Sequence, residues 1–188
     1  MRVDTVTGLL HEARYVPSPN ADERPMGAIL ELIVVHGISL PPGEFGGGWI
    51  DALFTNRLDA RAHPYFAGIC GHRVSAHALI RRDCEVVQYV PFHRRAWHAG
   101  TSTYQGRARC NDFSIGIELE GADDLNYEAG QYHTLAAIIN ALIEAYPTLS
   151  RDDIVGHADI APGRKTDPGS AFDWPRLYHL LEVSEKSS

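Results

Sequence analysis

The longest apolar stretch of the chain, residues 29–38, reads ILELIVVHGI and is rich in β-branched side chains. A short run of this kind is typical of a strand buried in the middle of a sheet. Residues 114–121, SIGIELEG, alternate strictly, so that three apolar side chains face one side while Gly116, Glu118 and Glu120 face the other. These two segments predict the centre of a β-sheet.

Helical periodicity marks two segments in the C-terminal half. Apolar side chains recur at helical spacing through residues 128–146, and Pro147 ends the pattern. A shorter helix is predicted over residues 174–183, with Asp173 as its N-cap.

Shorter strands complete the pattern. Residues 74–80 and 86–90 flank a polar turn and predict a β-hairpin, while residues 96–100 and 154–155 predict two further short strands. The combined elements indicate an α/β protein with a largely central sheet, in one domain that comprises residues 1–188.

The two ends of the chain and one long connection lack this periodicity. Residues 1–28 are polar and punctuated by prolines and glycines, which predicts an irregular N-terminal arm, and residues 184–188 predict a flexible tail. Residues 39–73 are longer than an ordinary connection within a domain, and such segments are usually functional or disordered. A helical pattern at residues 49–58 and several aromatic side chains favour a folded flap.

Composition narrows the class of protein and its partners. The chain has 188 residues, of which 44% are hydrophobic and 22% charged, as in ordinary globular domains. A formal net charge of −7 without long basic runs argues against a nucleic-acid partner. The sequence shows neither a signal peptide nor the roughly 20 apolar residues that span a membrane. Three cysteines at unpatterned spacings fit a reducing compartment, so we expect a cytoplasmic protein. We also expect a monomer without a membrane partner.

Candidate chemistry concentrates in residues 156–169, GHADIAPGRKTDPG. This segment combines His157, Lys165 and Asp167 with prolines and glycines that predict an ordered, irregular loop. His157 and His36 each end a short apolar strand beside a small residue, which leaves room for a ligand. Together with Asp167 they form a ligand set of catalytic zinc sites, with a fourth position open for water. For either histidine alone, a hydrogen bond to backbone is the alternative.

The same regions offer a general base and a cation. Glu118 shares a strand face with Gly116, which clears space, so Glu118 can take a proton from a water molecule activated by zinc. Glu120 lies on that face too, and spacing does not exclude it. Lys165 is two residues from Asp167, so an extended stretch would place its charge near the metal, opposite a developing oxyanion. Each residue could instead be a solvated surface charge.

Five longer segments match one family: LELIVVHGISLPPGEFGG, HPYFAGICGHRVSAHALIRRD, VVQYVPFHRRAWHAG, YQGRARCNDFSIGIELEG and GHADIAPGRKTDPG. The resemblance covers residues 12–180. They resemble the AmpD-type 1,6-anhydro-N-acetylmuramyl-L-alanine amidases, cytoplasmic members of the zinc amidase superfamily related to phage T7 lysozyme and peptidoglycan recognition proteins. The resemblance implies a fold of the amidase and peptidoglycan-recognition-protein type, a single domain with a central mixed β-sheet flanked by helices. It also implies one Zn²⁺ per chain.

The resemblance assigns roles residue by residue. The histidine that ends the VVH strand, the histidine of GHxxIAP and the aspartate of RKTDPG are the zinc ligands, here His36, His157 and Asp167. The first glutamate of GIELEG assists catalysis, which selects Glu118, and the lysine of RKTD is the other catalytic residue, Lys165. The implied reaction hydrolyses the amide between anhydro-N-acetylmuramic acid and L-alanine of an anhydro-muropeptide, in peptidoglycan recycling.

Substrate contacts and departures from the family pattern follow from the same comparison. Stem-peptide carboxylates need cations, and Arg73 and Arg109 lie in the matching segments, while Trp97 is expected to pack on the sugar ring. Gly37 and Gly163 stand where the family more often has asparagine and glutamate.

Three other functions compete with this interpretation. A lytic amidase acting on intact peptidoglycan would need export and often a wall-binding domain, and neither is visible in the sequence. A recognition module without catalysis would lack a zinc ligand, whereas all three are present here. A thiol hydrolase built on Cys110 would need a base and an oxyanion motif, which do not accompany it.

Overall fold

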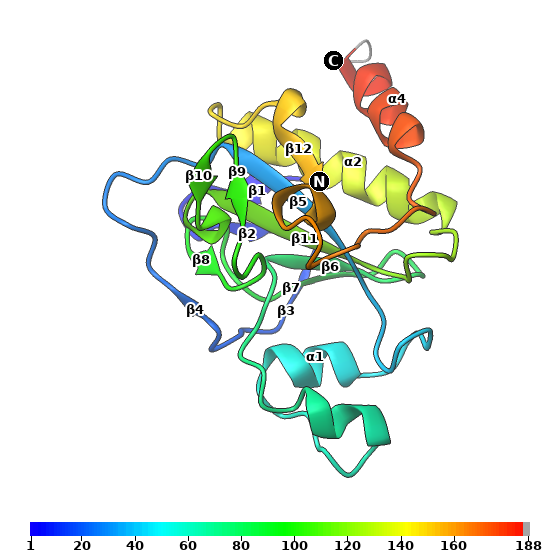
Figure 1. Cartoon of the computed structure of the whole chain (residues 1–188). Helices are drawn as coiled ribbons and strands as arrows, with labels where there is room; N and C mark the ends of the chain where they lie inside the picture. The colour runs from blue at the N-terminus through cyan, green and yellow to red at the C-terminus, as the bar shows by residue number, and fades with distance from the viewer. Residues whose placement is uncertain (186–188) are drawn as a thin grey trace.

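A six-stranded sheet organises the computed structural model, which describes residues 1–185 (Figure 1). Its order is β12 (Ile154–Gly156), β5 (Leu32–Ile38), β11 (Ser114–Glu120), β6 (Ala78–Ile80), β7 (Val86–Gln88) and β3 (Arg14–Tyr15). The first four strands are parallel, β7 is antiparallel to β6, and β3 is parallel to β7. The prediction of a central mixed sheet is therefore confirmed.

The two strands predicted at the centre of the sheet are its longest members. Each has seven residues, and every residue of β11 is buried. β5 begins at Leu32 rather than at Ile29, which is half exposed. The alternation predicted for β11 is present: Ile115, Ile117 and Leu119 join the main hydrophobic core.

That core lies between one face of the sheet and two helices. α2 (Ala129–Ala145) and α4 (Trp174–Glu185) contact each other and lie on one side of the sheet in Figure 1. α2 begins at a capping box made by Glu128 and Gln131, and Pro147 follows its end, as predicted. α4 extends past Val183 to Glu185, and the rest of the predicted flexible tail lies outside the described residues. In the described part of the chain, none of the helices has the length and apolar character needed to cross a membrane.

The opposite face of the sheet is covered by the long connection after β5. This segment folds into α1 (Trp49–Phe54) and the 3₁₀ helix η1 (Pro64–Gly68), so the expected flap is ordered, although its helix ends before Leu58. Leu53, Phe54 and Phe66 of the flap pack with Leu79 and Tyr89 in a second hydrophobic core on this face of the sheet. The flap is thereby anchored to the sheet beside the candidate site.

The N-terminal arm is more regular than predicted. It contains β1 (Val3–Asp4), β2 (Leu9–Leu10) and β4 (Ala21–Asp22), besides β3 in the main sheet. β1 pairs with β2, and β4 pairs with β8 (Arg95–Ala96). Two-residue strands leave too little alternation for a pattern to reveal them. The remaining short elements are β9 (Thr103–Tyr104), β10 (Arg107–Ala108), η2 (Cys110–Asp112), η3 (Arg151–Asp153) and α3 (His157–Ile160).

Candidate active site

The carboxyl ends of three parallel strands bring the predicted metal ligands and the predicted base to one place. β5 and β11 run in register, with Glu118 opposite His36. β12 lies on the other side of β5 and pairs its last residue, Gly156, with Val35, so His157 follows directly beyond the strand end. Ligands commonly bind at this edge of an open α/β sheet.

Asp167 reaches the two histidines because the loop that carries it folds back on α3. A single helical turn begins at His157, where the sequence predicted an irregular loop throughout. The N–H of Ala158 then donates to the carbonyl of Asp167 at 3.0 Å. This backbone bond places the carboxylate beside His157, although ten residues separate them in the sequence.

Three potential ligand atoms converge between these residues. Nδ1 of His36 lies 3.0 Å from Nδ1 of His157 and 3.2 Å from Oδ2 of Asp167, and His157 Nδ1 lies 3.0 Å from the same oxygen. A tetrahedral zinc ion with bonds of about 2.0–2.1 Å holds its ligand atoms about 3.3 Å apart. The spacing of the three atoms fits a bound metal ion.

The protonation states of His36 and Asp167 fit a metal as well. Burial lowers the pKa of His36 to about 4 against the opposing effect of Asp167, so the ring is neutral near pH 7. Burial raises the pKa of the Asp167 carboxyl, but its hydrogen bonds with His157 and His36 outweigh that effect and hold the pKa below the usual range. Neutral imidazole and ionised carboxylate are the forms that bind zinc.

Glu118 is a buried carboxylate at the wall of the cavity. Its Oε2 atom has no hydrogen-bond partner among the described residues. Burial raises the pKa of Glu118 well above its ordinary value, the charge of Asp167 raises it further, and Lys165 opposes both effects. A carboxylate with such a pKa is suited to general acid–base catalysis near neutral pH.

Glu120, the alternative base, is bound elsewhere. Its Oε1 accepts the N–H of Gly46 at 2.6 Å, and its Oε2 accepts the N–H of Arg82 at 3.3 Å. Arg81 adds an ion pair at 3.6 Å. Since Glu118 lines the cavity next to the candidate ligands and Glu120 is held by these contacts, the geometry favours Glu118.

A cavity of about 820 Å³ opens beside these groups. Leu53 and Tyr65 of the flap line one side, while Asp123, Asp124 and Lys165 contribute charged side chains. Lys165 is exposed, and its positive charge acts to lower the pKa of Glu118. The cavity thus combines apolar walls with a few convergent charges, as small-molecule sites do.

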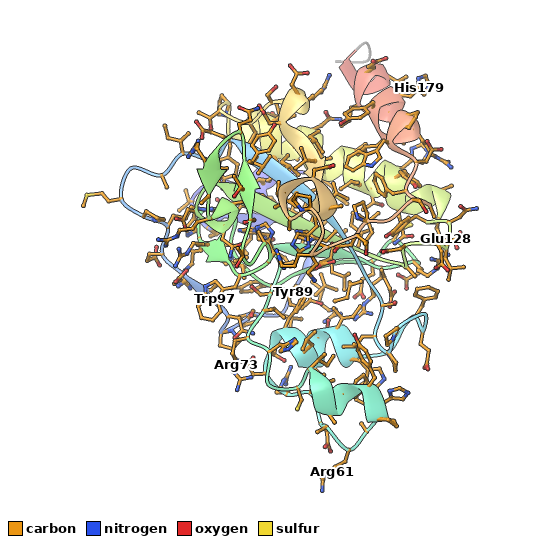
Figure 2. The ribbon with its side chains drawn as sticks, in the orientation of Figure 1. Arg61, Arg73, Tyr89, Trp97, Glu128 and His179 are labelled. Carbon is orange, nitrogen blue, oxygen red and sulfur yellow. The ribbon has the colours of Figure 1, made fainter. Side chains whose placement is uncertain are left out.

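The predicted substrate contacts lie outside the residues that line this cavity. Trp97 donates its indole N–H to Asp22 at 3.1 Å, and the Arg109 guanidinium, 71% exposed, pairs with Asp112 at 3.2 Å. Arg73 is exposed between two cavity residues, His72 and Val74, so its backbone is at the rim (Figure 2 labels Arg73 and Trp97).

The sequence did not indicate the roles of two further residues of the site, Arg164 and His98. Arg164 donates to the carbonyls of Ala99 and Thr101 at 2.6 and 2.7 Å and ties the loop before Lys165 to the chain after β8. His98 is buried against His36, and Gly116 provides the space for it: a Cβ at Gly116 would lie 2.4 Å from His98 Cγ. The basic side chain within the RKTD motif was the only signal for Arg164.

Cys110, the candidate for a thiol hydrolase, is fully buried in a small apolar cluster with Leu32, Val34 and Phe113. Burial raises the pKa of its thiol against a hydrogen bond from Ser102. A buried thiol with a raised pKa is a poor nucleophile, so the structure gives this alternative no support.

Comparison with known proteins agrees with the geometry. A sequence model described as N-acetylmuramoyl-L-alanine amidase matches residues 26–170. The chain is 64% identical over 177 residues to 1,6-anhydro-N-acetylmuramyl-L-alanine amidase AmpD of Citrobacter freundii, with 94% of each chain covered. It is 65% identical to the Escherichia coli AmpD over 174 residues, covering 93% of this chain and 94% of the relative. A crystal structure of AmpD in selenomethionine form superposes with a TM-score of 0.93 at 64% identity, covering 96% of this chain and 99% of the other. The chain therefore belongs to the N-acetylmuramoyl-L-alanine amidase family.

Proposed function

We propose that the protein hydrolyses the amide between 1,6-anhydro-N-acetylmuramic acid and the L-alanine of a stem peptide, and acts in the recycling of peptidoglycan fragments. The observation that supports this best is the convergence of His36, His157 and Asp167 beside Glu118 at the edge of one cavity. The AmpD relatives, which match almost the whole chain, carry this substrate in their names.

The three convergent residues would hold one Zn²⁺ per chain. Two neutral imidazoles and a carboxylate give a site with a net charge of +1 and leave a fourth position for solvent or substrate. When bound, the ion supplies two effects: it lowers the pKa of water to about 7, and it polarises the amide carbonyl.

The protein supplies the proton transfers. Glu118 takes the proton of the attacking water and later delivers it to the L-alanine nitrogen, which leaves as an amine. Its burial fits this role, because a raised pKa makes the carboxylate a stronger base toward the proton of water. Lys165 at the cavity wall stabilises the negative charge that develops on the lactyl carbonyl oxygen.

Recognition of the substrate would use the cavity and its rim. The anhydro-sugar and the first residues of the peptide fit a space of about 820 Å³ with apolar and charged walls. Arg73 and Arg109 are proposed to bind carboxylates of the stem peptide beyond its L-alanine. Trp97 is proposed to contact the sugar. We infer that the protein acts as a monomer in the cytoplasm on this small-molecule partner.

Product analysis tests the reaction. The protein is incubated with anhydro-muramyl tripeptide and, separately, with intact sacculi, with and without a zinc chelator, and the products are identified by mass spectrometry. We expect free tripeptide and anhydro-sugar from the first substrate, loss of both with chelator, and little release from sacculi. Cleavage of sacculi but not of the anhydro substrate would establish a lytic amidase instead. Binding of the tripeptide without cleavage, in the zinc-loaded protein, would indicate a recognition module.

A further inference from the structure

The two candidate metal-binding histidines are supported by adjacent residues of one segment. Nε2 of His36 lies 2.9 Å from Nδ1 of His98, and Nε2 of His157 lies 3.2 Å from the carbonyl oxygen of Ala99. In both cases the nitrogen concerned is the one that faces away from the candidate metal. One short stretch of chain after β8 therefore contacts both ligands from behind.

The hydrogen bonds favour a proton on the Nε2 atom of both candidate ligands. The Ala99 carbonyl can only accept, so His157 carries its proton on Nε2 and presents a lone pair at Nδ1. His98 Nε2 lies 3.1 Å from the hydroxyl oxygen of Ser114, which can accept its proton. His98 Nδ1 is then an acceptor for the Nε2–H of His36, and Nδ1 of His36 is also left as a lone pair.

The segment is itself held by a side chain. Oδ1 of Asn111 accepts the N–H groups of both His98, at 3.2 Å, and Ala99, at 2.8 Å. Arg24 in turn donates to the Asn111 carbonyl at 3.0 Å. Two consecutive N–H groups bound to one amide oxygen define where the His98 ring and the Ala99 carbonyl lie.

The place occupied by His98 is shaped for an imidazole. The residue is buried, and β11 has glycine at position 116 where any larger residue would collide with its ring. His77 packs edge-on against the same ring, with centroids 5.7 Å apart. Its ring nitrogens contact Arg24, Arg94 and Gly116 and form no described hydrogen bond with His36 or His157. The ring of His98 thus has no freedom to turn its acceptor away from His36.

We propose that His98 and Asn111 are positioning residues for the metal site: His98 orients His36 directly, and Asn111 fixes the segment that orients both histidines. The inference rests on the zinc site of the proposed function and extends it to residues that do not touch the metal. Substitution of groups that orient metal-binding histidines in this way typically lowers metal affinity by about 10- to 100-fold.

Four substitutions at three positions separate this role from simple packing. His98→Ala removes the acceptor and leaves a cavity. His98→Asn also removes most of the ring, but its Oδ1 takes the place of Nδ1 and can still accept the His36 proton. His77→Ala is the matched control, because it removes a buried imidazole from the same cluster without touching a candidate ligand. Asn111→Ala tests the segment independently, should His98→Ala fail to fold.

The measurement is the affinity for zinc alone. Full-length proteins are stripped with a chelator and titrated with Zn²⁺ in competition with a chromophoric chelator, and the Co²⁺ absorption spectrum reports ligand geometry. Thermal unfolding of the metal-free proteins records the loss of stability separately. No substrate is needed, so the result stands whether or not the proposed amide hydrolysis is found.

We expect His98→Ala and Asn111→Ala to lower zinc affinity by about 10- to 100-fold and to change the Co²⁺ spectrum. His98→Asn should stay within about threefold of the unsubstituted protein, as should His77→Ala despite a lower Tm. The proposal is overturned if His98→Ala and Asn111→Ala bind zinc normally, or if His77→Ala loses as much affinity as His98→Ala. Equal loss in His98→Asn and His98→Ala would also contradict it. If no variant or parent binds zinc, the metal site of the proposed function fails first.

Discussion

Glu118 of β11 lies opposite His36 of β5, and the parallel pairing of these two strands sets the separation of the proposed base from the proposed metal. Both residues stand near the carboxyl ends of the longest strands, in the most buried part of the sheet. In this buried position, the Oε2 atom of Glu118 has no hydrogen-bond partner among the described residues.

Exchange of glutamate for glutamine distinguishes the two carboxylates of β11. Glu118→Gln should lower kcat by about 10²- to 10⁴-fold, the usual contribution of general acid–base catalysis. Zinc content should be retained, and the Tm should not fall, since a buried unpartnered charge is removed.

Glu120→Gln is the control on the same strand face. Its contacts with Gly46, Arg81 and Arg82 should make the substitution destabilising by about 1–3 kcal/mol, with kcat within about threefold of the parent. Steady-state kinetics and thermal unfolding of both variants give the comparison. Near-normal turnover in zinc-loaded Glu118→Gln would remove Glu118 from the mechanism.

Gly37 lies against the side chain of Tyr127. A Cβ at position 37 would lie 2.2 Å from the Tyr127 hydroxyl, which donates to the carbonyl of Pro168 at 2.9 Å. Gly37→Ala should therefore cost about 1–3 kcal/mol of stability and disturb the chain next to Asp167. Tyr127→Phe removes the colliding oxygen, so Gly37→Ala should cost less in that background. Equal costs in the two backgrounds, measured by denaturant unfolding, would show that the hydroxyl is not the obstacle.

The regular part of the fold could be predicted because its elements are long and periodic. The strands at 32–38 and 114–120 and the helix at 129–145 bury one or both faces, and burial imposes the hydrophobic pattern that reveals them. The strands of the N-terminal arm have two residues each, too few for a period.

The site was harder to predict, because its decisive contacts join distant parts of the chain. Glu118 and Glu120 have the same residue type and strand face, and contacts of Glu120 with Gly46, 74 residues away, and with Arg81 and Arg82 distinguish their environments. The space beside Gly116 was interpreted as room near Glu118, whereas the imidazole of His98 fills it. The residues themselves indicate a zinc ligand set of moderate specificity, whereas the bond that is cut follows only from the family resemblance.

His77 predicts how stability depends on pH. Burial, followed by the nearby Arg24 charge, lowers its pKa from 6.5 to about 3. Between these two values the unfolded chain binds a proton that the folded protein does not, so stability is lost as the pH falls below 6.5. One pH unit below that value, this residue alone should cost about 1 kcal/mol.

His77→Gln tests this contribution in chelator-treated protein. Denaturant unfolding between pH 4.5 and 6 should give a shallower dependence of the unfolding free energy on pH than in the parent, by about one proton. The same slope in both proteins would show that His77 does not titrate as its burial requires.

Arg73 and Arg109 are proposed to bind the stem peptide, although neither side chain lines the cavity. Arg73→Gln and Arg109→Gln should raise KM for anhydro-muramyl tripeptide by about 3- to 30-fold, as expected for the loss of a charged hydrogen bond, with smaller changes in kcat. Arg61→Gln, at an exposed flap position far from Trp97 in Figure 2, is the control. Unchanged KM in both variants would assign the peptide carboxylates to other groups.

The most direct test of the account is a zinc titration of activity. Chelator-stripped protein and its Asp167→Ala variant are titrated with Zn²⁺ while release of tripeptide from anhydro-muramyl tripeptide is measured. We predict that the stripped parent is inactive and regains full activity at one zinc per chain, and that Asp167→Ala recovers less than about 1% under the same conditions. Activity in the stripped parent, or full recovery of Asp167→Ala at one equivalent of zinc, would contradict the central claim that His36, His157 and Asp167 hold the catalytic metal.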